Sequence, residues 1–88
     1  MMSWTLKISE AAQADLDYFR AYDSETYNNC YELSKAVAEA PYLGLGKPLK
    51  LVDAGGDVWF RRSSLTHRMV YEVFNDVIVV ASYRTHVD

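Results

Sequence analysis

The sequence predicts an α+β fold in which two N-terminal helices pack on a curved, mostly antiparallel sheet of four to five strands, in the order β-α-α-β-β-β-β. Two observations carry this prediction. Residues 9–40 repeat their apolar side chains at helical spacing, whereas residues 4–8 and 58–83 show the alternating or continuous apolar runs of strands. The chain of 88 residues is long enough for one small core, and we expect a single domain over residues 1–88.

The N-terminal half is predicted to hold one strand and both helices. Residues 4–8 alternate apolar and polar side chains, as a half-buried strand does. Ser9 suits the N-cap of the first helix, residues 23–24 provide the break and cap before the second, and Pro41 ends the second. The residues expected on the buried helix faces recur every three or four positions. They are Ala12, Leu16 and Phe19 on the first helix and Thr26, Cys30, Leu33, Val37 and Ala40 on the second.

The C-terminal half is typical of strands. A short strand is expected within residues 47–52, where Pro48 confines it to a sheet edge or to its own first position. Three longer strands are expected at residues 58–63, 68–74 and 77–83. Residues 75–76 give a two-residue hairpin signal. Because residues 77–81 are apolar on both faces, we expect this strand to lie centrally in the sheet, covered by the helices.

The hairpin register decides which side chains can meet. The predicted two-residue loop pairs Tyr71 with Val80 and Arg68 with Tyr83, and paired residues share a face. Strict alternation then places His86 on the face opposite Arg68. A site that uses Arg68 together with His86 therefore requires a bulge or a bend in the chain near its end.

Composition and charge limit the possible functions. The formal net charge of −3 argues against strong nonspecific binding of nucleic acid, although residues 47–88 are richer in basic groups than residues 1–46. The single Cys30 cannot form an internal disulfide, which fits a cytoplasmic location. No apolar run approaches the length of a membrane span, and residues 1–8 lack the features of a signal peptide. Two histidines without clustered carboxylates are not a metal set, so we expect no metal or cofactor.

Basic residues recur along the C-terminal strands and could converge at one end of the sheet. They are Arg62, Arg68, Arg84 and His86. A site that handles a phosphodiester needs permanent cations, which arginine supplies in planar, bidentate form. It also needs a group that transfers a proton near neutral pH, and histidine is suited to this. The alternative is that these arginines are solvated charges that flank the strands.

Four motifs, in order, resemble the YoeB/Txe branch of the RelE toxin superfamily. They are Gly44-Leu-Gly-Lys-Pro48, Trp59-Phe-Arg-Arg62, His67-Arg-Met-Val-Tyr71 and Arg84-Thr-His86. The resemblance implies a toxin of a bacterial type II toxin–antitoxin system that binds the ribosomal A site and cuts mRNA by attack of a ribose 2′-OH on the neighbouring phosphate. It also implies a cognate antitoxin of the YefM/Axe kind, and either a homodimer or a toxin–antitoxin hetero-oligomer.

The resemblance assigns roles to individual residues. Arg68 would stabilise the transition state, His86 would transfer the proton and Arg62 would grip the phosphate. The other residues expected to contact RNA or phosphate are Lys47, Lys50, Arg84 and Tyr83. The sequence departs from the family where Leu49 replaces a glutamate and Val87 replaces a tyrosine. The family's lysine position falls on Val52, or on Lys50 if the alignment slides by two residues.

Three outcomes follow from the missing glutamate. His86 could act as the base, with Lys47 or Lys50 favouring its neutral form and holding the phosphate. Another carboxylate, such as Asp53 or Asp57, could enter the site. The protein could also be a weakened toxin that mainly binds its antitoxin. A gyrase-directed toxin of the related ParE branch is a further alternative, against which the Gly-Lys-Pro and Arg-x-His motifs argue.

Overall fold

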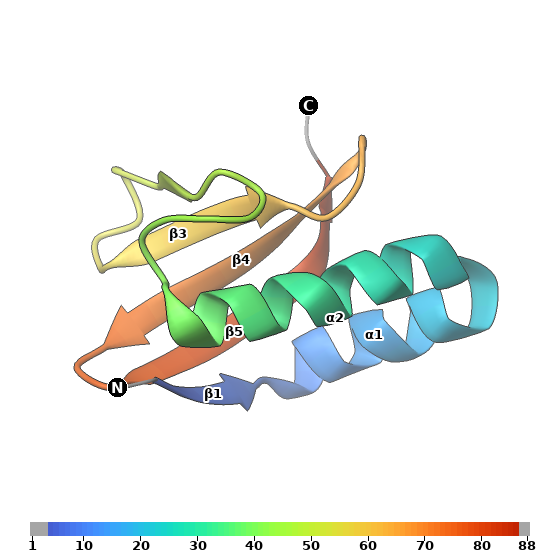
Figure 1. Ribbon diagram of the computed structural model, residues 1–88, viewed down its shortest axis with the longest axis horizontal. Helices are drawn as coiled ribbons and strands as arrows, with labels where there is room; N and C mark the ends of the chain where they lie inside the picture. Colours follow the sequence, from blue (N-terminus) through green and yellow to red (C-terminus); the bar gives the residue numbers. More distant parts are fainter. Residues whose placement is uncertain (1–3, 87–88) are drawn as a thin grey trace.

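The computed structural model describes residues 4–86, and for Thr85 and His86 it describes the backbone only. The elements are β1 (Thr5–Ile8), α1 (Glu10–Tyr22), α2 (Ser24–Glu39), β2 (Leu49–Lys50), β3 (Val58–Arg62), β4 (His67–Phe74) and β5 (Val77–His86). The strands form one sheet in the order β1-β5-β4-β3-β2. The two helices run antiparallel and side by side against this sheet (Figure 1), which confirms the predicted α+β fold.

Both helices begin at the predicted caps. Ser9 Oγ accepts a hydrogen bond from the backbone N–H of Ala12 at 3.1 Å, and the Asp23 carboxylate accepts one from the N–H of Thr26 at 3.1 Å. The buried helix residues are Ala12, Phe19, Thr26, Cys30, Leu33 and Val37, with Leu16 and Ala40 half-buried. The predicted helix faces are therefore confirmed. Within residues 4–86, neither helix has the length and apolar character that crossing a bilayer requires.

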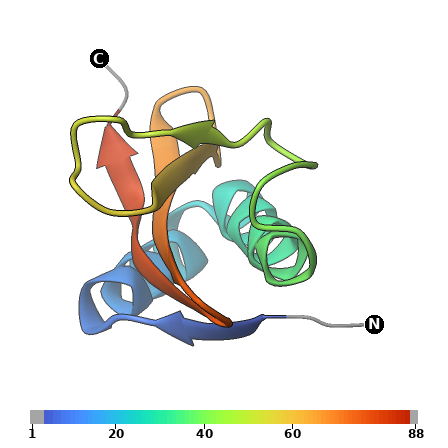
Figure 2. The ribbon, with the colours of Figure 1, turned by 90° about the vertical axis from the view of Figure 1, so that its left-hand side faces the viewer.

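The sheet is mixed because β1 runs parallel to β5 while the other neighbours are antiparallel. β5 carries the predicted central apolar run and lies between β1 and β4, with Ile78 and Val80 fully buried. The sheet curves around α2, so that the edge strands β1 and β2 lie at opposite ends of the curve (Figure 2). The core fills the space between the concave face and the helices.

The predicted hairpin register is correct only near the turn. Tyr71 pairs with Val80 as expected, but two register shifts follow. As a result, Arg68 pairs with Thr85 and not with Tyr83. A short hairpin loop fixes the register of the residues next to it, whereas bulges further along depend on contacts with other elements. These bulges move the end of β5 by two residues relative to β4.

The adjacent arginines of β3 face opposite sides of the sheet. Arg61 is fully buried, and its guanidinium donates to the carbonyl oxygens of Ala40, Leu43 and Leu45. Its Nε also donates to the Tyr71 hydroxyl at 3.1 Å. Arg61 thereby ties the loop between α2 and β2 to the sheet through three carbonyl groups.

Replacing Arg61 by alanine is expected to lower the free energy of unfolding by about 2–3 kcal/mol, because several charge-assisted hydrogen bonds are lost together. The matched substitution Arg62→Ala removes an exposed side chain and is expected to change stability by less than about 0.5 kcal/mol. Urea denaturation of both variants measures the difference. If Arg61→Ala and Arg62→Ala lowered the free energy of unfolding equally, Arg61 would not have the structural role described.

Candidate functional site

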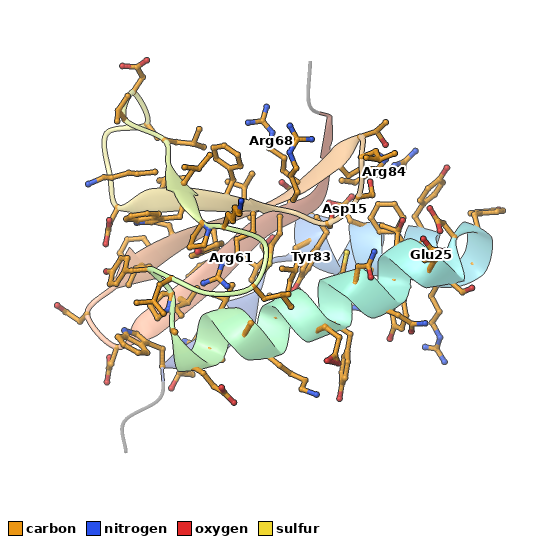
Figure 3. All side chains as sticks on the ribbon, turned by 45° about the horizontal axis from the view of Figure 1, so that its top comes forward. Asp15, Glu25, Arg61, Arg68, Tyr83 and Arg84 are labelled. Atoms are coloured by element: carbon orange, nitrogen blue, oxygen red, sulfur yellow. The ribbon has the colours of Figure 1, made fainter. Side chains whose placement is uncertain are left out.

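The convex face of the sheet carries a group of cations. β3 alternates, so that Arg61 faces the core while Phe60 and Arg62 face outward. Arg62 is paired with Arg68 on β4, and the Arg68 guanidinium carbon lies 4.6 Å from the centre of the Phe60 ring. In Figure 3, Arg68 projects from the side of the sheet opposite the helices. Like charges placed directly opposite on paired strands repel each other, and an anion bound between them would relieve this repulsion.

A groove of about 430 Å³ lies beside this arginine pair. It is lined by Gly46, Lys47, Leu49, Phe60 and Arg62. The groove is therefore lined by two cations and an aromatic ring, and no carboxylate is among the described residues that line it. Such a surface can hold a phosphate between cations while a flat base rests against the ring.

The turn that brings Lys47 to the groove depends on Gly46. Gly46 and Lys47 both have positive φ, of 84° and 50°, and the Lys47 N–H donates to the Gly44 carbonyl at 3.1 Å. A Cβ atom on Gly46 would lie 2.9 Å from Leu33 Cδ2 and 3.2 Å from Arg61 Cβ. Only glycine therefore fits this close approach without displacing its neighbours.

Asp57, which the sequence suggested as a substitute base, makes its contacts away from the groove. Its carboxylate accepts from the Tyr42 hydroxyl at 2.6 Å and from Trp59 Nε1 at 2.8 Å, and lies 3.7 Å from Lys50 Nζ. Lys50 is paired with Trp59, whereas Leu49 is paired with Phe60, so Lys50 and Leu49 face opposite sides of the sheet. Lys50 is thus not brought to the groove, and neither Asp57 nor Asp53 lines it.

We expect Asp57 to make the free energy of unfolding depend on pH in the acid range. The hydrogen bonds from Tyr42 and then Trp59 lower the pKa of Asp57, and the same contact raises the pKa of Tyr42 to about 12. Stabilisation by Asp57 is therefore full above about pH 4 and is lost as the pH falls through its lowered pKa. We expect the stability difference between wild type and Asp57→Asn to shrink from pH 7 to pH 3 in urea denaturation, with Asp53→Asn as the control. A difference that is independent of pH would contradict this role.

Two of the predicted RNA contacts lie elsewhere. Tyr83 is fully buried, its hydroxyl is 2.6 Å from Ser34 Oγ, and burial raises its pKa to about 12. A buried ring cannot stack on a base, so Tyr83 is a core residue. The Arg84 guanidinium carbon lies 3.5 Å from the centre of the Tyr18 ring on α1, and Figure 3 shows it apart from Arg68.

His86 is described only through its backbone, which is paired with that of His67, while Arg68 is paired with Thr85. The backbone of His86 thus lies one residue pair from Arg68, at the end of the sheet where the groove cations gather. Its side chain, like the whole of Val87, lies outside the described residues. The structure therefore unites Lys47, Arg62 and Arg68 on one surface and brings the backbone of His86 next to it. Because the register shifts by two residues, an even number, Arg68 and His86 stay in neighbouring pairs, and the shift alone does not bring His86 to the face of Arg68.

Phe60 lines the groove, and the sequence analysis did not predict this role. Period-two alternation along β3 would have found it, because an outward Arg62 requires an outward Phe60. The inward direction of Arg61 could have been found in the same way. Adjacent residues of a strand face opposite sides, so only one of the two arginines can face outward.

The chain matches a known protein family over most of its length. Residues 8–87 match the family described as YoeB-like toxin of bacterial type II toxin–antitoxin system. Toxin YoeB of Escherichia coli (strain K12) is 33% identical over 78 residues, covering 89% of this chain and 93% of the relative. The YoeB dimer of Staphylococcus aureus is 30% identical, with a TM-score of 0.84 over 96% of this chain and 98% of the other. A heterotetrameric YoeB–YefM complex from the same organism is also 30% identical, with a TM-score of 0.81 and the same coverage.

Proposed function

The chain belongs to the YoeB-like toxins of bacterial type II toxin–antitoxin systems, and from this premise we propose that it is a ribosome-dependent mRNA endoribonuclease. It acts in the cytoplasm, binds the ribosomal A site and inhibits translation by cutting the message there. The observation that carries the proposal is the groove on the convex face, which Lys47, Phe60 and Arg62 line and beside which Arg68 lies over the Phe60 ring.

The reaction fits a cationic groove. The ribose 2′-oxygen forms a bond to the adjacent phosphorus as the bond to the 5′-oxygen breaks, which leaves a 2′,3′-cyclic phosphate and a 5′-hydroxyl. Negative charge builds on the non-bridging phosphate oxygens, and Arg68 stabilises it. Arg62 and Lys47 hold the phosphate in line. His86 transfers the proton between the attacking and leaving oxygens.

Leu49 makes this site unusual. Its side chain is 58% exposed in the groove, at the position where the resemblance expects a glutamate, and it cannot accept a proton. His86 is then left as the proton acceptor, and the positive charge of Lys47 favours the neutral imidazole that this role needs. A positioned base contributes about 10²–10⁴-fold in rate, so we propose that cleavage is slower than in a relative that has the glutamate.

Binding of an antitoxin is the second function that the same surface supports. Leu49 lines the groove, Leu45 lines a neighbouring pocket together with Arg62, and both leucines are exposed. A partner segment with acidic and apolar side chains would neutralise the cations and cover this surface. We propose a cognate antitoxin of the YefM/Axe kind, either in a hetero-oligomer or in exchange with a toxin homodimer. The alternative is a protein that binds its antitoxin but hardly cleaves mRNA. Leu49 favours this alternative because it cannot accept a proton.

Primer extension on a translating message, with purified protein, tests the proposal. We expect wild type to cleave at A-site codons, His86→Ala to lose most of this activity, and added antitoxin to stop it. Arg84→Ala is the matched control, because the structure places this arginine on the α1 side. An intact message together with tight antitoxin binding would replace the nuclease proposal by the antitoxin-binding one.

A further inference from the structure

On the edge away from β4, the last part of β5 is held by a helix and not by a strand. β1 pairs with β5 only as far as Val80, although β5 continues to His86. Beyond this point α1 takes the place of β1 at the edge of β5. Ser9, its N-cap residue, donates from its backbone N–H to the Val80 carbonyl at 3.1 Å and from Oγ to the Ala81 carbonyl at 3.1 Å. An edge that would otherwise be open is thus partnered by side chains.

Asp15, six residues after Ser9, continues this pattern. One oxygen of its carboxylate, Oδ2, accepts hydrogen bonds from two consecutive backbone N–H groups, at 3.0 Å from Tyr83 and at 3.2 Å from Arg84. Figure 3 shows Asp15 on α1 beside Tyr83 and Arg84. In a regular strand, consecutive N–H groups point to opposite edges, so a single acceptor cannot serve both. The pair of contacts therefore belongs to the irregular part of β5.

The register shifts of the β4–β5 pair lie at the same place. Between the pairs Tyr71–Val80 and Arg68–Thr85, β5 contains two more residues than β4. Extra residues in a bulge are left without ladder partners. The Asp15 carboxylate supplies the missing acceptor, and because it is charged, its hydrogen bonds are stronger than those of a neutral carbonyl.

We propose that Asp15 is a positioning residue for the C-terminal histidine. By fixing the bulge in β5, it sets the register in which His86 is paired with His67, next to the pair formed by Arg68 and Thr85. Without the bulge, the simple hairpin register would pair Arg68 with Tyr83 and displace the end of the chain by two residues. Asp15 itself does not touch the groove, and this inference rests on the proposed role of His86 in cleavage.

A double-mutant cycle separates positioning from general stabilisation. We expect Asp15→Ala to lower kcat about 10- to 10²-fold, the effect of a misplaced catalytic group, with KM little changed. In a His86→Ala background the same substitution should have no further effect, because Asp15 acts only through His86. Asp15→Asn keeps an acceptor oxygen and should restore most of the activity. Asp17→Ala is the matched control on the exposed side of α1.

A second measurement does not depend on cleavage. In NMR spectra, Asp15→Ala should speed amide exchange at Tyr83 and Arg84 and remove the backbone cross-strand NOE between His67 and His86, whereas Asp17→Ala should leave both unchanged. If wild type does not cleave, the proposed function fails, and this measurement still decides whether Asp15 sets the register. An unchanged NOE, or an equal loss of kcat from Asp15→Ala with and without His86, would overturn the inference.

Discussion

Replacing Arg68 by alanine is expected to lower the rate of mRNA cleavage about 10²- to 10³-fold, the usual cost of removing a group that stabilises charge in the transition state. Arg68 is half-buried on the convex face, paired with Arg62 and held over Phe60. Its guanidinium is therefore already in position when the substrate binds. The negative charge that develops on the phosphate is then stabilised by a cation that does not have to move. Single-turnover cleavage of ribosome-bound message measures the effect.

Two further substitutions sharpen this result. Arg68→Lys keeps the charge but loses the planar fork, so it should recover only part of the rate. Arg84→Ala removes an equal charge outside the groove and should leave the rate within a few-fold of wild type. If alanine at position 68 cost no more than alanine at position 84, Arg68 would be an ordinary edge charge and the groove would not be the reaction site.

Introducing a carboxylate at Leu49 is expected to raise the cleavage rate by about 10²-fold or more, within the range that a positioned general base contributes. Leu49 is 58% exposed and lines the groove together with Lys47 and Arg62. A glutamate there would stay ionised beside these cations and could accept the proton of the 2′-OH. The substitution is on the surface, so it should change stability little.

The controls for Leu49→Glu separate proton acceptance from charge and shape. Leu49→Gln has the same shape without a base and should not raise the rate. Val52→Glu adds the same charge at a site that is 81% exposed and does not line the groove, and it should also have no effect on the rate. Equal rates for Leu49→Glu and Leu49→Gln would show that proton acceptance at this position is not what limits cleavage.

Much of the fold follows from local patterns. The caps at Ser9 and Asp23 and the apolar faces of both helices depend on residues a few positions apart, and sequence alone locates them. The hairpin turn likewise fixed the pairing of Tyr71 with Val80. The pairing of Arg68 could not be predicted in this way, because it depends on a bulge held by Asp15, far away along the chain.

The candidate site was predicted in part. Motif and charge identified Arg62, Arg68 and Lys47, which the structure brings to one surface. Tyr83 was misplaced because the bulges change which side chains of β5 face inward, whereas the Arg84 guanidinium lies over Tyr18 of α1 and not beside Arg68. A sequence pattern gives the kind of side chain available to a site, whereas the direction of each side chain depends on the register of its strand.

We propose that a groove of cations, with no carboxylate among the described residues that line it, supports attack by a ribose 2′-OH. The most direct test is single-turnover cleavage, on the ribosome, of a message with a single 2′-deoxy nucleotide at the cleavage position, compared with the all-ribose message. We predict that the all-ribose message is cut, that its upstream product ends in a 2′,3′-cyclic phosphate, and that the deoxy message stays intact. Cleavage of both messages at equal rates, or of neither, would contradict this account.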